Sequence, residues 1–155
     1  MSANSRLTVA THILAWMALV ARQSPAPVTS DRIARSVNTN PVVIRRMLGL
    51  LAKAGLVESY RGANAGWRLS RSADAITLLD VFDALEEGGP FALHPATPSQ
   101  NCPVGRGIGP ALGTVYGSID DALRKTLAAT SIEDVLRNTL ETGQGGPEDT
   151  PGTGG

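Results

Sequence analysis

The chain has 155 residues, of which 42% are hydrophobic and 18% charged, and its formal net charge at pH 7 is zero. This size suits one domain with an appendage and a real apolar core. No apolar run reaches the roughly 18 residues that cross a membrane, and the apolar stretch at 7–21 lacks a signal-peptide cleavage site. We therefore expect a cytoplasmic protein without membrane contact.

The chain has a single cysteine, Cys102. One cysteine excludes an intramolecular disulfide and cannot by itself hold zinc or an iron–sulfur cluster. We therefore expect no metal and no cofactor.

Charge is distributed unevenly along the chain. Residues 30–71 contain eight basic and two acidic side chains, whereas residues 72–155 contain four basic and twelve acidic ones. Such segregation indicates that one part of the chain meets a polyanion, while the other faces water or another subunit.

The first predicted element is a helix over residues 7–22. Its apolar residues recur at the spacing of one helical face: Val9, Ile13, Trp16, Met17 and Val20. Arg6 precedes this helix and is available to a phosphate. The helix is expected to lie in the core.

Two helices separated by a tight polar turn follow from residue 27. Thr29 or Ser30 can cap the first of them, and Asn40 and Pro41 suit the cap and first position of the second. The apolar residues of the second helix recur every three or four positions: Val43, Ile44, Met47, Leu48 and Leu51. The two arginines between them, Arg45 and Arg46, fall on its open side.

A β-hairpin is predicted next, because residues 56–60 alternate like a strand and a glycine-bearing loop at 61–66 turns the chain back. Helix, turn, helix and hairpin with a basic tip is the order of a winged helix-turn-helix, whose second helix enters the major groove of DNA. Thr77 and Asp80 form a capping-box pattern for one more short helix. Residues 1–85 are thus the expected DNA-binding domain.

Residues 86–107 are rich in proline and glycine, so we expect a loop there. Cys102 lies in this segment, close to Arg106 and to the start of the next predicted helix. A helix N-terminus and a nearby cation make a thiol more reactive, which favours a sensor for an oxidant or other small effector. The alternative is a small buried residue that anchors the loop.

Residues 108–141 are predicted to form a long dimerisation helix and a short terminal helix. The long helix has an apolar seam at alternating steps of four and three: Ile108, Leu112, Val115, Ile119, Ala122, Leu123 and Thr126. A twin helix from a second chain is the simplest cover for this seam, so we expect a homodimer. Folding back onto the first helix is the alternative, and both arrangements can coexist.

Residues 142–155 contain no apolar side chain that could be buried, and we expect them to be disordered.

Three segments carry a resemblance to a known family: Leu50–Val57, Ser59–Leu69 and Ile76–Val81. Through them, residues 5–140 resemble the bacterial winged-helix regulators typified by IscR, NsrR and CymR. Three further segments are similar to the YwnA-like branch of that family: Ser5–Leu7, Ser36–Val43 and Cys102–Gly105. The resemblance implies a mainly α fold with a small β-hairpin and a long C-terminal dimerisation helix. It also implies a dimeric transcription factor, in most members a repressor.

This chain departs from the family pattern in two places. Several members hold an iron–sulfur cluster through three cysteines in the loop before the dimer helix, whereas this chain has only Cys102. The wing has Ala63, Asn64 and Ala65 ahead of Gly66, where the family has a run of glycines. The first departure makes a cluster held by one chain improbable, and the second limits how closely the wing backbone approaches DNA.

The predicted DNA contacts fall into three groups. Residues at or near the start of the second helix are placed to reach base edges: Thr39, Asn40, Val42, Val43, Arg45 and Arg46. An arginine can bind guanine through O6 and N7, and a valine methyl can touch the thymine methyl, but the sequence leaves open which arginine reads a base. Phosphate contacts are expected from Arg6, Thr29, Ser30 and Lys53, and minor-groove contacts from Arg61 and Asn64.

The sequence therefore predicts a dimeric regulator that binds an inverted repeat in double-stranded DNA. Two other functions remain open. A winged helix can hold a protein partner in place of DNA, and Cys102 with His94 would be the reactive pair of a thiol enzyme.

Overall fold

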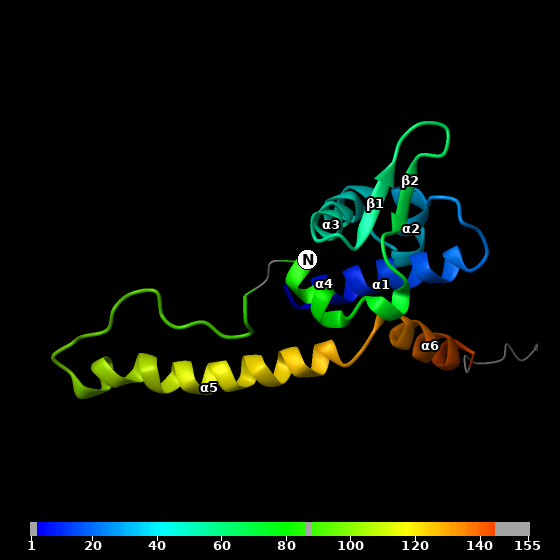
Figure 1. The fold of residues 1–155 in the computed structure, drawn as a ribbon. Coiled ribbons are helices and arrows are strands. Elements are labelled where there is room, and N and C mark those ends of the chain that lie inside the picture. The colour runs from blue at the N-terminus through cyan, green and yellow to red at the C-terminus, as the bar shows by residue number, and fades with distance from the viewer. Residues whose placement is uncertain (1–2, 86–87, 145–155) are drawn as a thin grey trace, which may run out of the picture.

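Two parts make up the structure: a head of short helices and a hairpin, and one long helix that extends away from the head (Figure 1). The computed structural model describes residues 3–85 and 88–144. In chain order the elements are α1 (Ala3–Ala21), α2 (Ser30–Val37), α3 (Pro41–Lys53), β1 (Val57–Tyr60), β2 (Gly66–Leu69), the 3-10 turn η1 (Ala73–Ala75), α4 (Leu78–Ala84), α5 (Pro103–Ala128) and α6 (Ile132–Gly143). The expected mainly helical fold with one small hairpin is confirmed.

The helix-turn-helix is formed by α2 and α3, and each helix starts at a side-chain cap. Thr29 caps α2, since its hydroxyl accepts a hydrogen bond from the amide of Arg32 at 3.3 Å. Asn38 ends α2 in the left-handed conformation, with φ 57°. Asn40 then caps α3, and its side chain accepts from the amide of Val42 at 2.8 Å. The turn is short because one helix ends and the next begins within three polar residues.

The wing is the antiparallel pair β1 and β2, in which Tyr60 lies opposite Gly66. Strand β2 is tied to the linker before α2 by an isolated bridge between Val28 and Trp67. In this bridge the Val28 amide donates to the Trp67 carbonyl at 2.9 Å, and the Trp67 amide donates to the Val28 carbonyl at 2.8 Å. Gly66 makes the bridge possible, because its φ is +149° and a Cβ there would lie 2.6 Å from the Val28 oxygen.

A single apolar core holds the head together. Its largest fully buried side chains come from α1, α2, α3, α4, α6 and the segments between them: Ile13, Leu14, Ile33, Ile44, Leu48, Leu51, Leu56, Ile76, Val81 and Ile132. Helix α1 lies at its centre and contacts α2, α4, α6 and β2. The expectation that the first helix belongs to the core is confirmed.

The last helix belongs to this head. We expected one unit over residues 108–141 that contained both the long helix and the terminal one, but α6 returns to pack against α1. Its Ile132 and Leu136 enter the core. A two-residue bridge fixes its start, with the Ile132 amide donating to the Ile76 carbonyl at 2.8 Å and the Leu78 amide to the Thr130 carbonyl at 2.9 Å. The apolar face of α6 explains the difference, since it is buried by the head.

Two boundaries near the C-terminal half also differ from the expected ones. Helix α5 begins at Pro103, with Cys102 as its N-cap residue, so the loop expected at 86–107 ends at Cys102. Proline suits the first helical position, and Gly105 allows close packing, since a Cβ there would collide with the Ser99 carbonyl. Helix α6 continues to Gly143, past the expected end at 141. The remainder of the tail expected to be disordered, residues 145–155, lies outside the described residues.

Within residues 3–85 and 88–144, no helix is both long and apolar enough to cross a membrane.

The close approach of Gly66 to the Val28 carbonyl can be tested by substitution. Gly66→Ala should lower the free energy of unfolding by about 2 kcal/mol or more, because the added methyl meets the Val28 carbonyl and the backbone conformation is strained for alanine. Chemical denaturation measures this loss. Gly117→Ala is the control: Gly117 lies within α5, and a Cβ added there would meet no other atom within 4 Å, so alanine should be neutral or stabilise by about 0.5–1 kcal/mol. Equal stabilities of the two variants would contradict the packing argument.

Candidate nucleic-acid interface

Helix α3 has two opposite faces of different character. Its buried residues are Ile44, Met47, Leu48 and Leu51. The exposed residues recur three, one, three and four positions apart on the other side: Val42, Arg45, Arg46, Gly49 and Lys53. We call these five the α3 stripe. The burial of one face therefore turns three cations and a valine outward.

The two arginines of the α3 stripe differ in their surroundings. A guanidinium nitrogen of Arg45, Nη1, donates to the hydroxyl of Ser30 at 3.4 Å, which ties Arg45 to the start of α2. Arg46 has no hydrogen-bond or ion-pair partner among the described residues and is exposed. Arg46 is thus the arginine whose fork is available to an external ligand.

The start of α2 and the turn lie next to the α3 stripe. Thr29 is exposed but its hydroxyl is used in the cap, and Ser30 is buried. Thr39 and Val43 are half-buried, and Asn40 is exposed with its carbonyl oxygen committed to the cap of α3. These side chains therefore fix the starts of α2 and α3 at least as much as they are available for contacts with DNA.

Two residues on this surface, Arg35 and Gly49, are not among the DNA contacts predicted from the sequence. Arg35 of α2 is exposed without an ion-pair partner among the described residues, and Gly49 is the gap in the middle of the α3 stripe, with open space around its Cα. Arg35 was already visible in the charge of residues 30–71. Gly49 could be recognised only by its position on the exposed face.

The wing projects from the head as a separate finger (Figure 1). Arg61 and Asn64 are both exposed in the loop that joins its strands. Below them, the guanidinium carbon of Arg68 lies 5.4 Å from the centre of the Tyr60 ring. The Tyr60 hydroxyl donates to Glu58 at 2.6 Å, and this hydrogen bond raises the pKa of Tyr60. Glu58 is thereby engaged within the wing, away from Arg61.

Arg6 and Lys53 complete the set of expected contacts. Arg6 is half-buried on α1 and Lys53 is exposed in the last turn of α3. Both side chains also interact within the chain.

Four ion pairs between described residues lie away from the α3 stripe. They join Arg22 to Glu133, Arg71 to Asp80, Arg124 to Asp83 and Arg137 to Asp134. The Asp134 pKa is lowered by the hydrogen bond from the Ser131 backbone and then by Arg137. Acidic side chains thus offset the charge of arginines on the flanks of the head. The positive charges of Arg35, Arg46 and Arg61 are not offset by an acidic partner among the described residues.

Cys102 is exposed at the start of α5, and its side chain makes no capping hydrogen bond. The alternative of a small buried residue that anchors the loop is therefore wrong, because Cys102 is exposed and not buried. Arg106 donates from Nη1 to the Gln100 carbonyl at 2.8 Å. His94 accepts a hydrogen bond at Nδ1 from the Ala96 amide, 2.9 Å away in its own loop.

The residues present do not fit an iron–sulfur cluster held by one chain. The sequence supplies one cysteine, and the described residues contain no group of three or more His, Cys, Asp or Glu side chains placed to bind a metal ion.

The seam of α5 is exposed to solvent in this single chain. No residue of α5 is buried, and large apolar side chains stand open along it, including Val104 (69% exposed), Ile108 (41%), Val115 (52%) and Ile119 (37%). Leu112 and Leu123 are half-buried, and Ala122 and Thr126 are exposed. The helix contacts the head chiefly through α4, where Arg124 forms two hydrogen bonds with Asp83 at 3.0 and 3.2 Å. The seam is not covered by folding back onto α1.

Comparison with known proteins shows which family has this architecture. A family model described as Rrf2, iron-dependent transcriptional regulator, matches residues 3–138. An HTH-type regulator protein of Bacillus subtilis, YwnA, is 40% identical over 136 residues, which span 87% of this chain and 97% of that protein. The regulator CymR of the same organism is 29% identical over 121 residues, 78% of this chain and 80% of CymR.

Solved structures agree with this placement. A crystal structure described as that of a DNA-binding protein superposes with a TM-score of 0.67 at 38% identity, covering 85% of this chain and 99% of that one. T. potens IscR gives a TM-score of 0.67 at 18% identity over 98% and 94% of the two chains, which supports the fold alone. With a family model matched over most of its length and a close relative covered almost completely, the chain belongs to the Rrf2 family and is a DNA-binding transcriptional regulator, not an enzyme.

Proposed function

We propose that the protein is a homodimeric repressor that binds an inverted repeat, with α3 of each subunit in a major groove and the wing in the adjacent minor groove. The observation that carries this proposal is the α3 stripe: cations and a valine that the packing of the opposite face turns outward. A major groove about 12 Å wide accepts one such helix.

Arg46 is the proposed base reader. It is exposed and has no partner among the described residues, so its guanidinium can take the two acceptors of guanine in a fork. Arg45 is held toward Ser30 and is better suited to fix the angle between α2 and α3 or to contact a phosphate. Val42, 51% exposed one turn earlier, can meet a thymine methyl. Gly49 leaves room for the backbone of α3 to approach the bases.

Phosphate contacts would frame the reading helix. The first amides of α2, including that of Ser30, lack intrahelical partners by the geometry of a helix start and can donate to a phosphate. Arg6, Thr29, Arg35 and Lys53 add side chains near the same strand of DNA. Such contacts position the head without reading sequence.

The wing would add a contact on the other side of the reading helix. Arg61 and Asn64 are exposed at its tip, and an arginine is attracted to the negative potential of a narrow minor groove.

The dimer would form along α5. Its exposed apolar seam from Ile108 to Thr126 follows the period of a two-helix contact and lies open in the single chain. A twofold axis through such a contact presents two heads to half-sites separated by about one turn of DNA, roughly 10 base pairs, or a multiple of it. Occupation of such a site can exclude RNA polymerase, so we expect repression in the bacterial cytoplasm.

The effector of this repressor would act through the segment before α5. Cys102 is an exposed thiol at the N-cap of that helix, where an oxidant can reach it. A modified side chain at this position would change the start of the dimer helix.

Substitution of Arg46 tests the reading assignment. Arg46→Ala should reduce the preference for a selected operator over a scrambled duplex by about 1–3 kcal/mol, because O6 and N7 of a guanine lose the two N–H groups that donate to them. Lys53→Ala should weaken both duplexes alike and reduce the salt slope by about 1. Fluorescence anisotropy over a salt series, with an operator recovered from randomised DNA, measures both quantities.

Arg137→Ala is the matched control for this series. It removes the same charge from α6, where Arg137 pairs with Asp134, and should leave operator affinity unchanged. Equal losses on both duplexes for Arg46→Ala and Lys53→Ala would refute a reading role for Arg46.

A charge in the α5 seam tests the dimer. Ile119→Glu should raise the dimer dissociation constant by about a hundredfold or more, since a carboxylate buried in an apolar seam without a partner costs several kcal/mol. Thr114→Glu adds the same charge on another, exposed face of α5 and should leave the dimer intact. Sedimentation equilibrium gives both constants, and a dimer that tolerates Ile119→Glu would place the interface elsewhere.

Oxidation tests the effector role of Cys102. Stoichiometric conversion of the thiol to a mixed disulfide with glutathione should lower operator affinity by about tenfold, because a bulky charged group then stands at the start of the dimer helix. The same treatment of Cys102→Ser should have no effect. Unchanged affinity after complete modification, confirmed by mass spectrometry, would remove Cys102 from the proposal.

A further inference from the structure

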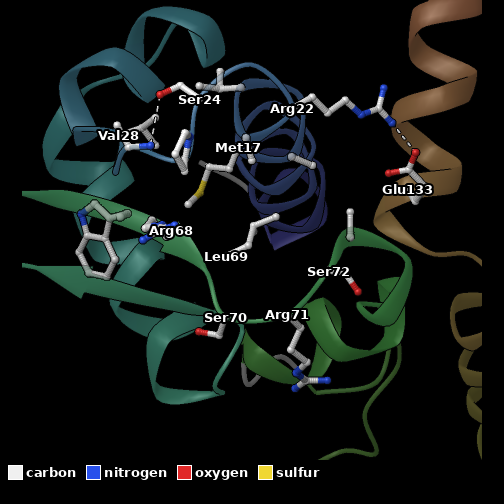
Figure 2. Close-up of a pocket in the computed structure, with 17 residues that line it drawn as sticks. Met17, Arg22, Ser24, Val28, Arg68, Leu69, Ser70, Arg71, Ser72 and Glu133 are labelled. Atoms are coloured by element: carbon white, nitrogen blue, oxygen red, sulfur yellow. Dashed lines mark hydrogen bonds and ion pairs between the residues drawn. The ribbon is translucent and has the colours of Figure 1, made fainter.

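A cavity of about 560 Å³ lies at the base of the wing, on the flank of the head. Its walls come from the end of α1, the linker before α2, strand β2, η1 and the first turn of α6 (Figure 2). Apolar residues of the lining come from α1, the linker before α2 and β2, among them Val20, Val28 and Leu69. Cavities that hold small organic ligands have this size, roughly 300–1,000 Å³.

The charged part of the lining is mainly basic. Arg22, Arg68 and Arg71 are opposed there by one acidic side chain, Glu133. Arg22 follows the last residue of α1, and Glu133 lies in the first turn of α6. Figure 2 shows these two side chains reaching toward each other across the rim of the cavity.

The Arg22–Glu133 ion pair is suited to exchange. The two side chains are 47% and 34% exposed, and ion pairs with this exposure contribute little to folding. Little free energy is therefore lost when a carboxylate from solution displaces Glu133 from Arg22. An apolar group attached to that carboxylate would gain burial that Glu133 cannot, because it would lie on half-buried apolar side chains of the lining such as Val20 and Leu69.

We propose that this cavity binds a small organic carboxylate with a compact apolar body, whose carboxylate takes the place of Glu133 on Arg22. Arg22 is the anchor because its partner, Glu133, itself lines the cavity, so a ligand carboxylate can take the place of that partner. The other two arginines have partners outside the lining: Arg68 lies over the Tyr60 ring and Arg71 lies 3.8 Å from Asp80. Glu133 acts as the internal competitor of the ligand.

The position of the cavity gives its occupant access to the wing. Val28 and Trp67, which line it, are also the two residues whose mutual hydrogen bonds fix β2 to the linker before α2. A ligand in the cavity would pack against this bridge and slow its opening. The site itself does not depend on DNA binding, so it can be tested on the free protein.

The test uses the full-length protein and three probes of matched size or charge. 3-Phenylpropanoate has both the carboxylate and the apolar body, 3-phenylpropanamide has the body without charge, and inorganic phosphate has the charge without the body. Isothermal titration should show binding of 3-phenylpropanoate at least about tenfold tighter than that of either other probe, since a charge-assisted hydrogen bond and apolar burial are both required.

Two substitutions at the rim separate ligand binding from folding. Arg22→Gln and Glu133→Gln break the same ion pair, so a purely structural role predicts the same effect for both. The proposal predicts opposite effects: 3-phenylpropanoate should bind about tenfold more weakly to Arg22→Gln and several-fold more tightly to Glu133→Gln, which lacks the competitor. Circular dichroism verifies that both variants are folded.

Amide hydrogen exchange supplies an independent readout. Exchange at Val28 and Trp67 should slow on addition of 3-phenylpropanoate to the protein without DNA. Changes of affinity in the same direction for both variants, equal binding of phosphate and 3-phenylpropanoate, or no binding of 3-phenylpropanoate would each overturn the proposal. None of these outcomes depends on whether the α3 stripe reads DNA.

Discussion

The burial of one face of α3 is the constraint on which the proposed DNA interface depends. Ile44, Met47, Leu48 and Leu51 are withdrawn from water into the core shared with α1, and each such side chain contributes about 1.5–3 kcal/mol when fully buried. No rotation of α3 could bury Arg46 without exposing two or more of these residues. The cations therefore face solvent because the apolar residues occupy the side of α3 that packs on the core. Their exposure lowers the stability of the fold little.

Charge segregation in the sequence becomes more pronounced in the folded chain. Acidic residues of the C-terminal half pair with arginines on the flanks, as Asp83 does with Arg124 and Glu133 with Arg22. Arg35, Arg46 and Arg61 have no such partner among the described residues. The positive potential is thus strongest around the helix-turn-helix, because the acidic side chains pair with arginines elsewhere on the molecule. A count of charges per segment cannot show this pairing.

Local signals predicted most of the head, and long-range packing decided the rest. The caps at Asn40 and Thr77 and the apolar period of α3 act within a few residues, so the sequence displays them directly. The bridge between Val28 and Trp67 joins residues far apart in the chain, and the return of α6 onto α1 does the same. The early start of α5 was obscured because its glycines suggested a loop, whereas Gly105 serves close packing against Ser99. The exposed face of α3 could be predicted from the period of its apolar residues. That Arg45 donates to Ser30, whereas Arg46 has no partner among the described residues, could be seen only from side-chain positions.

The junction between α5 and the head decides how two reading helices would be spaced. Arg124 of α5 donates two hydrogen bonds to Asp83 of α4. The segment after α5 is held by the bridge between Thr77 and Ser131. Both bridge residues are also capping-box residues, of α4 and α6, so three helix ends meet at one point. Because this connection contains paired backbone groups as well as an ion pair, a rotation of α5 would have to break several hydrogen bonds together. A change at the start of α5 would therefore be transmitted to the head as a tilt of the whole domain, and the distance between the two α3 helices of a dimer would change with it.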